Sequence, residues 1–459
     1  MATSELERVL ARHAAAVRYK DLPAPAVDAA RRQILWALGT AVAGAGAPAS
    51  DKVLAVVGEL GRGCPGDATI AGYGKRAPAL LAAFANSVYA KALEYEDKHW
   101  MNSVHAYAVG VSVVPAAFAV AEYLGNISGK DLLAAVAVAT DVQVRMINGA
   151  PHAIETSFNS TGMFSHFGAA VAAGRLLGLT EGRMLNALGI AYTQAAGNYQ
   201  ALQEGSLAFR MQTGFGVRNG IFAAFLARAD VDGPHEFLNG RHGLYPAFFK
   251  ECDADAVLGR LGALFWGTRM GFKAYPCCGL MHQTIDAVFK VKKTWSFRPE
   301  DVRSVELQVS PTVSTTCAPI QDKRHPRTQM EQQFSLPWAI ACVLTENRLS
   351  LANFMDEALH DSVKLALAQK ISVSLDSPDG RTSVTVTLTD GRKLTSEHVG
   401  PPSGHPDNPL SLDDLVERYR DCVRYGPKAL APERTERAKD MLLRLEDVGD
   451  VTEVIRLLG

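Results

Sequence analysis

The chain has 459 residues, of which 47% are apolar and 21% charged, and its formal net charge at pH 7 is −1. This composition is that of an ordinary globular protein, and a charge so close to zero gives no field that would favour nucleic acid or a membrane surface. At this length we expect two domains rather than a single core.

The cysteines and the first residues indicate a cytoplasmic protein. Seven cysteines occur, an odd number without a CxxC pair, which suits a reducing compartment and not a disulfide framework. The opening stretch, MATSELERVLARHAAAV, carries charges throughout and lacks the apolar region of a signal peptide. Gly, Pro or charged residues interrupt every apolar run before about 18 residues, so we expect no membrane span.

The first half of the chain is predicted to be helical. Apolar residues recur at helical spacing in AVDAARRQILWALGTAVAGA. ALLAAFANSVYAKAL, VVPAAFAVAEYL and GKDLLAAVAVATDVQVRM have the composition of helices that are buried on all sides. The Gly-rich stretch GRGCPGDATIAGYGKRA lacks the ending of a phosphate-binding loop and is interpreted as a connection.

A dense group of ionisable residues lies between two of these apolar helices, in KALEYEDKHWMNSVH at residues 91–105. Unpaired charges are costly to bury, so the group must be either solvated or organised. One interpretation is an exposed loop. The other is the floor of a pocket supplied with acids, a cation and imidazoles, which are the groups that transfer protons near neutral pH. The residues concerned are Glu94, Glu96, Asp97, Lys98, His99 and His105.

Two further stretches of the helical half carry polar residues in a small-residue context. SFNSTGMFSH runs into an Ala/Gly-rich helix, and Ser160 or Thr161 is a candidate cap for it. The start of that helix is either an anion site or simply a capped end. Further on, LAFRMQTGFGVRNG carries Arg210 and Gln212.

After residue 270 the pattern changes. VRSVELQVSP, ISVSLD, SVTVTLT and RKLTSEHV show the period-2, β-branched pattern of strands, with helices expected near 279–292, 331–346, 350–357 and 361–368. From SLDDLVERYRDCV onward the pattern is helical again. The sequence therefore predicts a mainly α protein: a large all-helical domain, 1–267 and 405–459, and a smaller α+β lid domain, 268–404. A domain tied by two crossings often closes over a cleft.

The junction GFKAYPCCGLMHQTIDAV places Lys273, Cys277, Cys278 and His282 within ten residues. Adjacent cysteines rarely close on one tetrahedral ion and this spacing matches no common zinc site, so no metal is expected. Two interpretations remain open. The thiols are buried at a helix start, or the segment forms the edge of a cleft where Lys273 binds a substrate carboxylate as a point charge.

Five stretches, in this order, resemble the MmgE/PrpD family, which includes 2-methylcitrate dehydratase, cis-aconitate decarboxylase and iminodisuccinate epimerase. The resemblance covers essentially the whole chain. It implies a helical domain plus an α+β lid with the active site between them, and it requires no metal or organic cofactor. It also implies a homodimer, which we expect to form through Ala/Gly-rich helices that look too apolar for exposure. The stretches are KALEYEDKHWMNSVH, STGMFSHFGAAVAAGRLLGL, RMQTGFGVRNGIFAAFLA, FKAYPCCGLMHQTIDAV and KRHPRTQMEQQFSLPWAIACVL.

Compared residue by residue, the helical half keeps the family's catalytic histidine at His105, which the resemblance makes the general base or acid. Glu94 stands where the family has its first aspartate and would orient His105 or shuttle a proton. Lys98 stands at a hydroxyl position, and Asn159 at the position of a second histidine.

The later stretches of the chain also keep some of the family's residues and replace others. Phe209 stands where the family has a lysine, with Arg210 beside it. Lys273 and His282 match the family's lid lysine and a later histidine. Cys278 replaces a histidine of the decarboxylases, and Trp338 replaces an aromatic hydroxyl. We therefore expect catalysis by His105, Lys273 and Glu94, and substrate binding by Lys98, Asn159, Arg210, Gln212, Tyr275, Cys278, His282 and Trp338.

The chemistry implied by the family passes through an enolate or carbanion beside a carboxylate. We predict a cofactor-independent lyase, a dehydratase or decarboxylase, that acts on a small carboxylic acid. An isomerase or epimerase that only transfers a proton is the second hypothesis. A catalytically inactive, metabolite-binding dimer is the third, motivated by Asn159, Phe209, Cys278 and Trp338.

Overall fold

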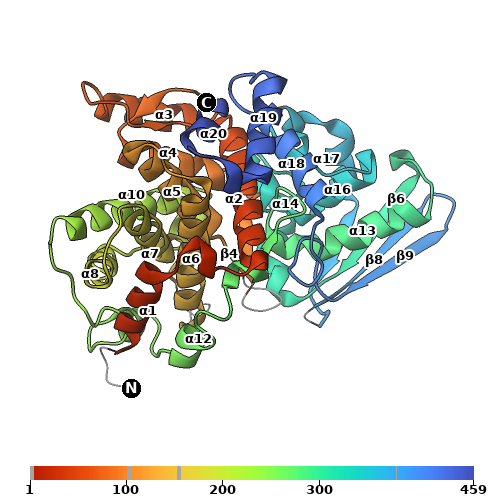
Figure 1. Cartoon of the computed structure of the whole chain (residues 1–459). Helices are drawn as coiled ribbons and strands as arrows, with labels where there is room; N and C mark the ends of the chain where they lie inside the picture. Colours follow the sequence, from red (N-terminus) through yellow and green to blue (C-terminus); the bar gives the residue numbers. More distant parts are fainter. Residues whose placement is uncertain (1–4, 101–105, 152–156, 379) are drawn as a thin grey trace.

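The computed structural model describes residues 5–100, 106–151, 157–378 and 380–459. A helical part and a part built around a β-sheet lie side by side, with α2 and α18 between them (Figure 1). The mainly α fold class predicted from the sequence is confirmed.

The helical part is organised around α7, since α5, α6, α8 and α10 all pack against it. The sequence makes this possible with small residues: a Cβ on Gly220 of α10 would lie 2.3 Å from the carbonyl oxygen of His166 on α7. The longer helices of this part are α1 (Glu5–Ala16), α2 (Ala24–Ala45), α3 (Ser50–Leu60), α4 (Ala79–Lys91), α5 (Gly110–Leu124), α6 (Gly129–Asn148), α7 (Ser160–Leu176), α8 (Glu181–Tyr192) and α10 (Ala208–Arg228). The short elements are α9 (Gln200–Gln203), α11 (Leu244–Phe248), α12 (Ala254–Leu258), β1 (Ala68–Thr69) and β2 (Arg76–Ala77).

Helix α2 passes so close to the end of α4 that only glycine fits at the crossing. A Cβ on Gly44 would lie 1.9 Å from the carbonyl oxygen of Tyr89. This contact fixes the last turn of α4, from which the chain enters the charged stretch.

A three-stranded sheet lies where the two parts meet, in the order β4-β3-β5, with antiparallel pairing throughout. Its strands are β3 (Asp97–Trp100), β4 (Ala106–Tyr107) and β5 (Met270–Phe272). Lys98 is paired with Gly271, so the charged stretch lies beside the junction that carries Lys273. The sequence pattern predicts no strand at His99 and Trp100, yet these residues belong to β3 and pair with β4.

The α+β part contains a four-stranded sheet in the order β7-β6-β8-β9, in which only β6 and β7 are parallel. Helix α13 packs against β8 and β9, and α16 packs against α13 and α17. The segment 350–357, expected to be a helix, forms 3₁₀ turns only. The elements are α13 (His282–Thr294), β6 (Val302–Gln308), α14 (Ile320–Arg324), α15 (Gln329–Gln333), α16 (Leu336–Glu346), α17 (Ser362–Gln369), β7 (Ile371–Ser374), β8 (Arg381–Leu388) and β9 (Lys393–Val399).

The chain then returns to the helical part with α18 (Leu412–Arg424), α19 (Pro432–Leu443) and α20 (Thr452–Leu457), of which α18 and α19 pack on α2. Two hydrophobic cores result. One is built almost entirely from residues 6–272 and 415–458, and the other from residues 277–394. The domain boundaries at 267 and 405 stay predictions.

All seven cysteines are unpaired. In the described ranges, no helix combines the length and the apolar character that crossing a membrane requires.

Candidate active site

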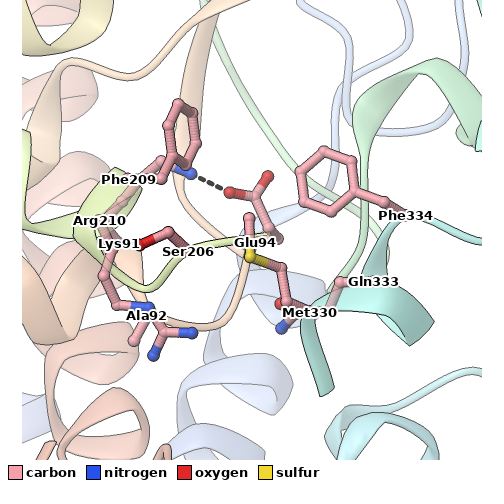
Figure 2. Close-up of a pocket in the computed structure, with 9 residues that line it drawn as sticks. All are labelled: Lys91, Ala92, Glu94, Ser206, Phe209, Arg210, Met330, Gln333 and Phe334. Carbon is pink, nitrogen blue, oxygen red and sulfur yellow. Dashed lines mark hydrogen bonds and ion pairs between the residues drawn. The ribbon is translucent and has the colours of Figure 1, made fainter. Parts of the chain in front are cut away.

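A pocket lies between the end of α4, the start of α10 and α15 of the α+β part (Figure 2). Two cations and one carboxylate, Lys91, Arg210 and Glu94, share the pocket with aromatic and aliphatic side chains. The lining residues are Lys91, Ala92, Glu94, Ser206, Phe209, Arg210, Met330, Gln333 and Phe334.

The turn after α4 directs its carboxylates inward. Glu94 has a φ of +50°, the left-handed region that non-glycine residues rarely occupy. Such conformations cost free energy and persist only where the surroundings impose them. Here the surroundings are lysine side chains that bind Glu94 and Glu96 from several sides.

Three lysines and two glutamates form one buried group, which we call the ion cluster: Lys91, Glu94, Glu96, Lys98 and Lys273. The ammonium of Lys273 donates to Glu94 Oε2 at 2.9 Å, to the carbonyl oxygen of Glu94 at 2.8 Å and to Glu96 Oε1 at 3.3 Å. Lys91 contacts Glu94 (Figure 2) and lies 3.0 Å from Glu96 Oε1, while Lys98 lies 2.9 Å from the same oxygen.

Burial decides between the two interpretations of the charged stretch. Glu96 and Lys273 are almost completely buried, and Lys91 and Glu94 nearly so. An exposed loop is therefore excluded for these residues. The structure brings Glu94, Lys98 and Lys273 together, as expected if they serve one site.

The lysines keep both glutamates ionised. Burial and the charge of Glu96 oppose ionisation of Glu94, but Lys273, Lys91 and Lys98 outweigh them, so the pKa of Glu94 is lowered. The same lysines hold the pKa of Glu96 well below its usual range against the effect of burial. Burial would lower the pKa of Lys273, yet Glu94 and Glu96 raise it above its ordinary value. The pKa of Lys98 is lowered, chiefly by burial, with the charges of Lys273 and Lys91 adding to the effect.

Arg210 enters the pocket from the first turn of α10. Its side chain is nearly buried, and its Nη1 has no hydrogen-bond partner among the described residues. Burial lowers the pKa of the guanidinium to about 10, with the charge of Glu94 acting in the opposite direction. A buried cation with an unused donor is costly unless an anion joins it, so Arg210 is suited to binding a carboxylate.

The α+β part contributes Tyr275, Cys278 and His282 near the ion cluster. The Tyr275 hydroxyl donates to Asp286 Oδ1 at 2.7 Å, and its ring meets the edge of His282 with the centroids 5.1 Å apart. Burial and the charge of Lys273 lower the pKa of His282 to about 3, so this imidazole is neutral. Burial raises the pKa of the Cys278 thiol, which is therefore protonated at neutral pH.

Asn159 and Gln212 contact each other and do not line the pocket. Asn159 Nδ2 donates to Gln212 Oε1 at 3.1 Å, and the Gln212 amide also binds the backbone of Asn198. Asn159 is the N-cap residue of α7, with no side-chain capping bond, so the expectation that Ser160 or Thr161 caps this helix is wrong.

Trp338 lies completely buried in the core of the α+β part, and its indole Nε1 donates to the carbonyl oxygen of Asn353 at 2.9 Å. This position gives no support to a role in substrate binding, which stays a prediction. His105 lies outside the described residues, so its role as the base also stays a prediction. In the described part of the chain, no group of three His, Cys, Asp or Glu residues is placed to hold a metal.

Sequence reasoning missed Lys91 and gave Glu96 no role. A signal for Lys91 exists: it is the only charged residue of α4, ALLAAFANSVYAK. A single charge in the last turn of a buried helix requires partners close by, and the carboxylates that follow it supply them.

Comparison with known proteins agrees with this architecture. The profile of the MmgE/PrpD N-terminal domain matches residues 8–256, and that of the MmgE/PrpD C-terminal domain matches residues 275–447. The chain belongs to the MmgE/PrpD family.

Among its relatives is a cis-aconitate decarboxylase of Aspergillus terreus, 29% identical over 471 residues, which include 96% of this chain and 93% of the relative. The cis-aconitate decarboxylases of Homo sapiens and Mus musculus are 26% and 25% identical. Both alignments cover 83% of this chain, with 80% of the human and 79% of the mouse protein.

Proposed function

We propose that the protein is a lyase that decarboxylates or dehydrates a small carboxylic acid through an enolate or carbanion. The observation that carries the proposal is the pocket in which Lys91 and Arg210 face Glu94 beside the ion cluster. Both reactions build negative charge next to a carboxylate. Fixed cations in a buried site stabilise such charge, often by a few kcal/mol for each donor.

In this proposal the described residues divide the work. Arg210 binds a substrate carboxylate. Lys273 positions Glu94, since all three of its N–H bonds already have protein acceptors. Glu94 stays ionised and holds the base, for which His105 is the candidate because an imidazole titrates near neutral pH. Lys98, whose pKa is lowered, is the second candidate for proton transfer. We propose no metal or organic cofactor.

The relatives' names support a carboxylic acid as the substrate, because all three are called cis-aconitate decarboxylases. An isomerase or epimerase is the second candidate. It is favoured by Asn159, which stands where the family resemblance places a second histidine and cannot relay a proton as an imidazole does.

The test is an assay of the purified protein with cis-aconitate and a panel of small di- and tricarboxylates in deuterated water. Released carbon dioxide identifies a decarboxylase, a change in double-bond absorbance identifies a dehydratase, and deuterium entering a carbon without net loss identifies an isomerase. If none of these acids reacts or exchanges a proton, the proposed enzyme activity is wrong.

We also propose a homodimer, for a reason that differs from the one the sequence suggested. The Ala/Gly-rich helices α5, α6 and α7 bury one another within a single chain, so they need no partner. Helix α10 instead exposes Phe215 and Phe222, at 44% and 47%, seven residues apart on the same face. A cytoplasmic location stays part of the proposal, supported by the seven unpaired cysteines.

A further inference from the structure

Lys91 occupies an unusual position for a buried lysine. It is the last residue of α4, its side chain is 5% exposed, and it lines the pocket directly. Its ammonium lies over the ring of Phe209, 5.4 Å from the centroid, and also contacts the carboxylates of Glu94 and Glu96. A cation over an aromatic face is stabilised without being neutralised.

The charges around the pocket do not balance. In the described part of the chain, the ion cluster and Arg210 bring four cations against the carboxylates of Glu94 and Glu96. The N–H bonds of Lys273 are all used, and neither Lys273 nor Lys98 lines the pocket. The pocket lining itself carries the cations Lys91 and Arg210 against the carboxylate of Glu94, so an incoming molecule meets a net positive charge.

We propose that Lys91 and Arg210 form a carboxylate-binding subsite, with Lys91 as a specificity-determining residue that selects substrates with a carboxylate at this end of the pocket. One carboxylate oxygen accepts a hydrogen bond from the unused Nη1 of Arg210. Another accepts from the Lys91 ammonium. When Lys91 donates one of its N–H bonds to the substrate, Glu94 still accepts a hydrogen bond from Lys273 at 2.9 Å. Phe209 covers the other side of the ammonium and keeps water from it.

This inference rests on the proposed function, because that proposal identifies the ligand as the substrate. Its test measures binding and not turnover. The probes are maleate, succinate and tricarballylate, with dimethyl maleate as an uncharged control, measured by isothermal titration calorimetry. Hydrogen bonds to charged groups are worth about 1.5–3 kcal/mol, so Lys91→Met should raise the Kd of the acids roughly 10- to 100-fold. The diester should not bind either protein.

The matched controls separate binding from folding. Lys52→Met removes an exposed lysine of α3 and should leave the Kd unchanged. The double variant Lys91→Met, Phe209→Lys places an ammonium on residue 209 in place of the aromatic ring that Lys91 contacts. It keeps the number of positive charges and should recover most of the affinity. This double variant also carries the test if Lys91→Met alone does not fold.

Unchanged affinity in Lys91→Met would overturn the subsite, as would a folded double variant that fails to bind or a wild-type protein that binds none of the acids. A lowered melting temperature with an unchanged Kd would make Lys91 purely structural, which also overturns the proposal. By contrast, a wild-type protein that binds the acids but transforms no substrate contradicts the proposed reaction and leaves the subsite intact.

Discussion

At the scale of single residues, Lys273 should matter for the fold as much as for the reaction. Removing one member of a buried ion group leaves the others uncompensated, typically at about 3–5 kcal/mol. Lys273→Met strips Glu94 of two hydrogen bonds and Glu96 of one. We therefore expect the free energy of unfolding, measured by urea titration, to fall by that amount.

The matched control is Lys293→Met on α13, which removes an exposed lysine and should change stability by less than about 0.5 kcal/mol. If Lys273→Met unfolds at the wild-type urea concentration but binds acids weakly, Lys273 contacts the substrate as the sequence suggested. In that case Lys273 gives up at least one of its three hydrogen bonds to Glu94 and Glu96 when the substrate binds.

His105 gives a second prediction at this scale. His105→Asn keeps the approximate size and the hydrogen bonding of the side chain but removes proton transfer. General acid–base catalysis typically contributes about 10²–10⁴-fold, so kcat on the identified substrate should fall by that order with the melting temperature unchanged. Full turnover in this variant would show that another residue is the base, with Lys98 the next to test.

The chemistry of the site was more predictable than its contacts. Charges between apolar helices must be paired, which marks Glu94 and Lys98 as candidates. Lys273 is a candidate because it lies at the junction between the helical and the strand-rich patterns. The missed residue, Lys91, lies in a helix that every other residue marks as core, so its composition hid it. Which lysine binds which oxygen depends on the left-handed turn at Glu94, and no local pattern predicts a non-glycine residue there.

At the scale of elements, β3 links the site to the start of α5 through Asp97. Its buried carboxylate accepts from the backbone N–H of Gly110, at 2.9 Å for each oxygen, and from Gln33 Nε2 at 2.7 Å. Burial nevertheless raises the pKa of Asp97 to about 6, in spite of these hydrogen bonds. The carboxylate thus anchors β3 while remaining sensitive to pH.

This raised pKa predicts a pH dependence with a definite sign. The folded state holds the Asp97 proton more tightly than the unfolded state, whose ordinary value is 3.8. The stabilising contribution of the protonated group is therefore complete below about pH 4 and is lost as the pH rises through 6, by an amount on the order of 3 kcal/mol. Asp97→Asn cannot titrate and should lack this loss.

The measurement is the free energy of unfolding of both proteins at several values between pH 4 and 7. Titration of Glu94, Glu96 and other groups is common to both proteins and cancels in the difference, so the wild type should lose stability relative to Asp97→Asn across this interval. A difference that is flat with pH, or that changes in favour of the wild type, would show that Asp97 is ionised throughout.

Sequence patterns located most elements because each pattern reflects one environment. The period-2 segments became β6, β7, β8 and β9, and the all-apolar segments became the central helices. The failure at β3 has a physical reason: DKHW shows no alternation of apolar residues. It pairs with β4, which follows directly in the sequence, and with β5, which lies in the second half of the chain. A local pattern carries no information on so distant a partner as β5.

At the scale of the whole molecule, the chain crosses between two hydrophobic cores, and the pocket lies where they meet. Residues of α4 and α10 come from the helical part, while Met330, Gln333 and Phe334 come from the α+β part. A change in the distance between the parts would therefore open or close the pocket without unfolding either core. This arrangement suits a reaction whose charged intermediate must be kept from water.

The last prediction concerns the assembly of two molecules through the outer face of α10. Phe215 and Phe222 of α10 are exposed there. Tyr123 of α5, which is 46% exposed, packs against Phe225 of α10. Obligate homodimers commonly bury about 2,000 Å² or more around such apolar centres. We expect sedimentation at micromolar concentration to show a dimer, and Phe222→Glu to convert it to a monomer, because a buried unpaired carboxylate at the interface is costly. Val399→Glu, at an exposed position of β9, is the matched control and should leave the dimer intact. A monomeric wild type, or a dimer that tolerates Phe222→Glu as well as it tolerates Val399→Glu, would show that this face is not the interface.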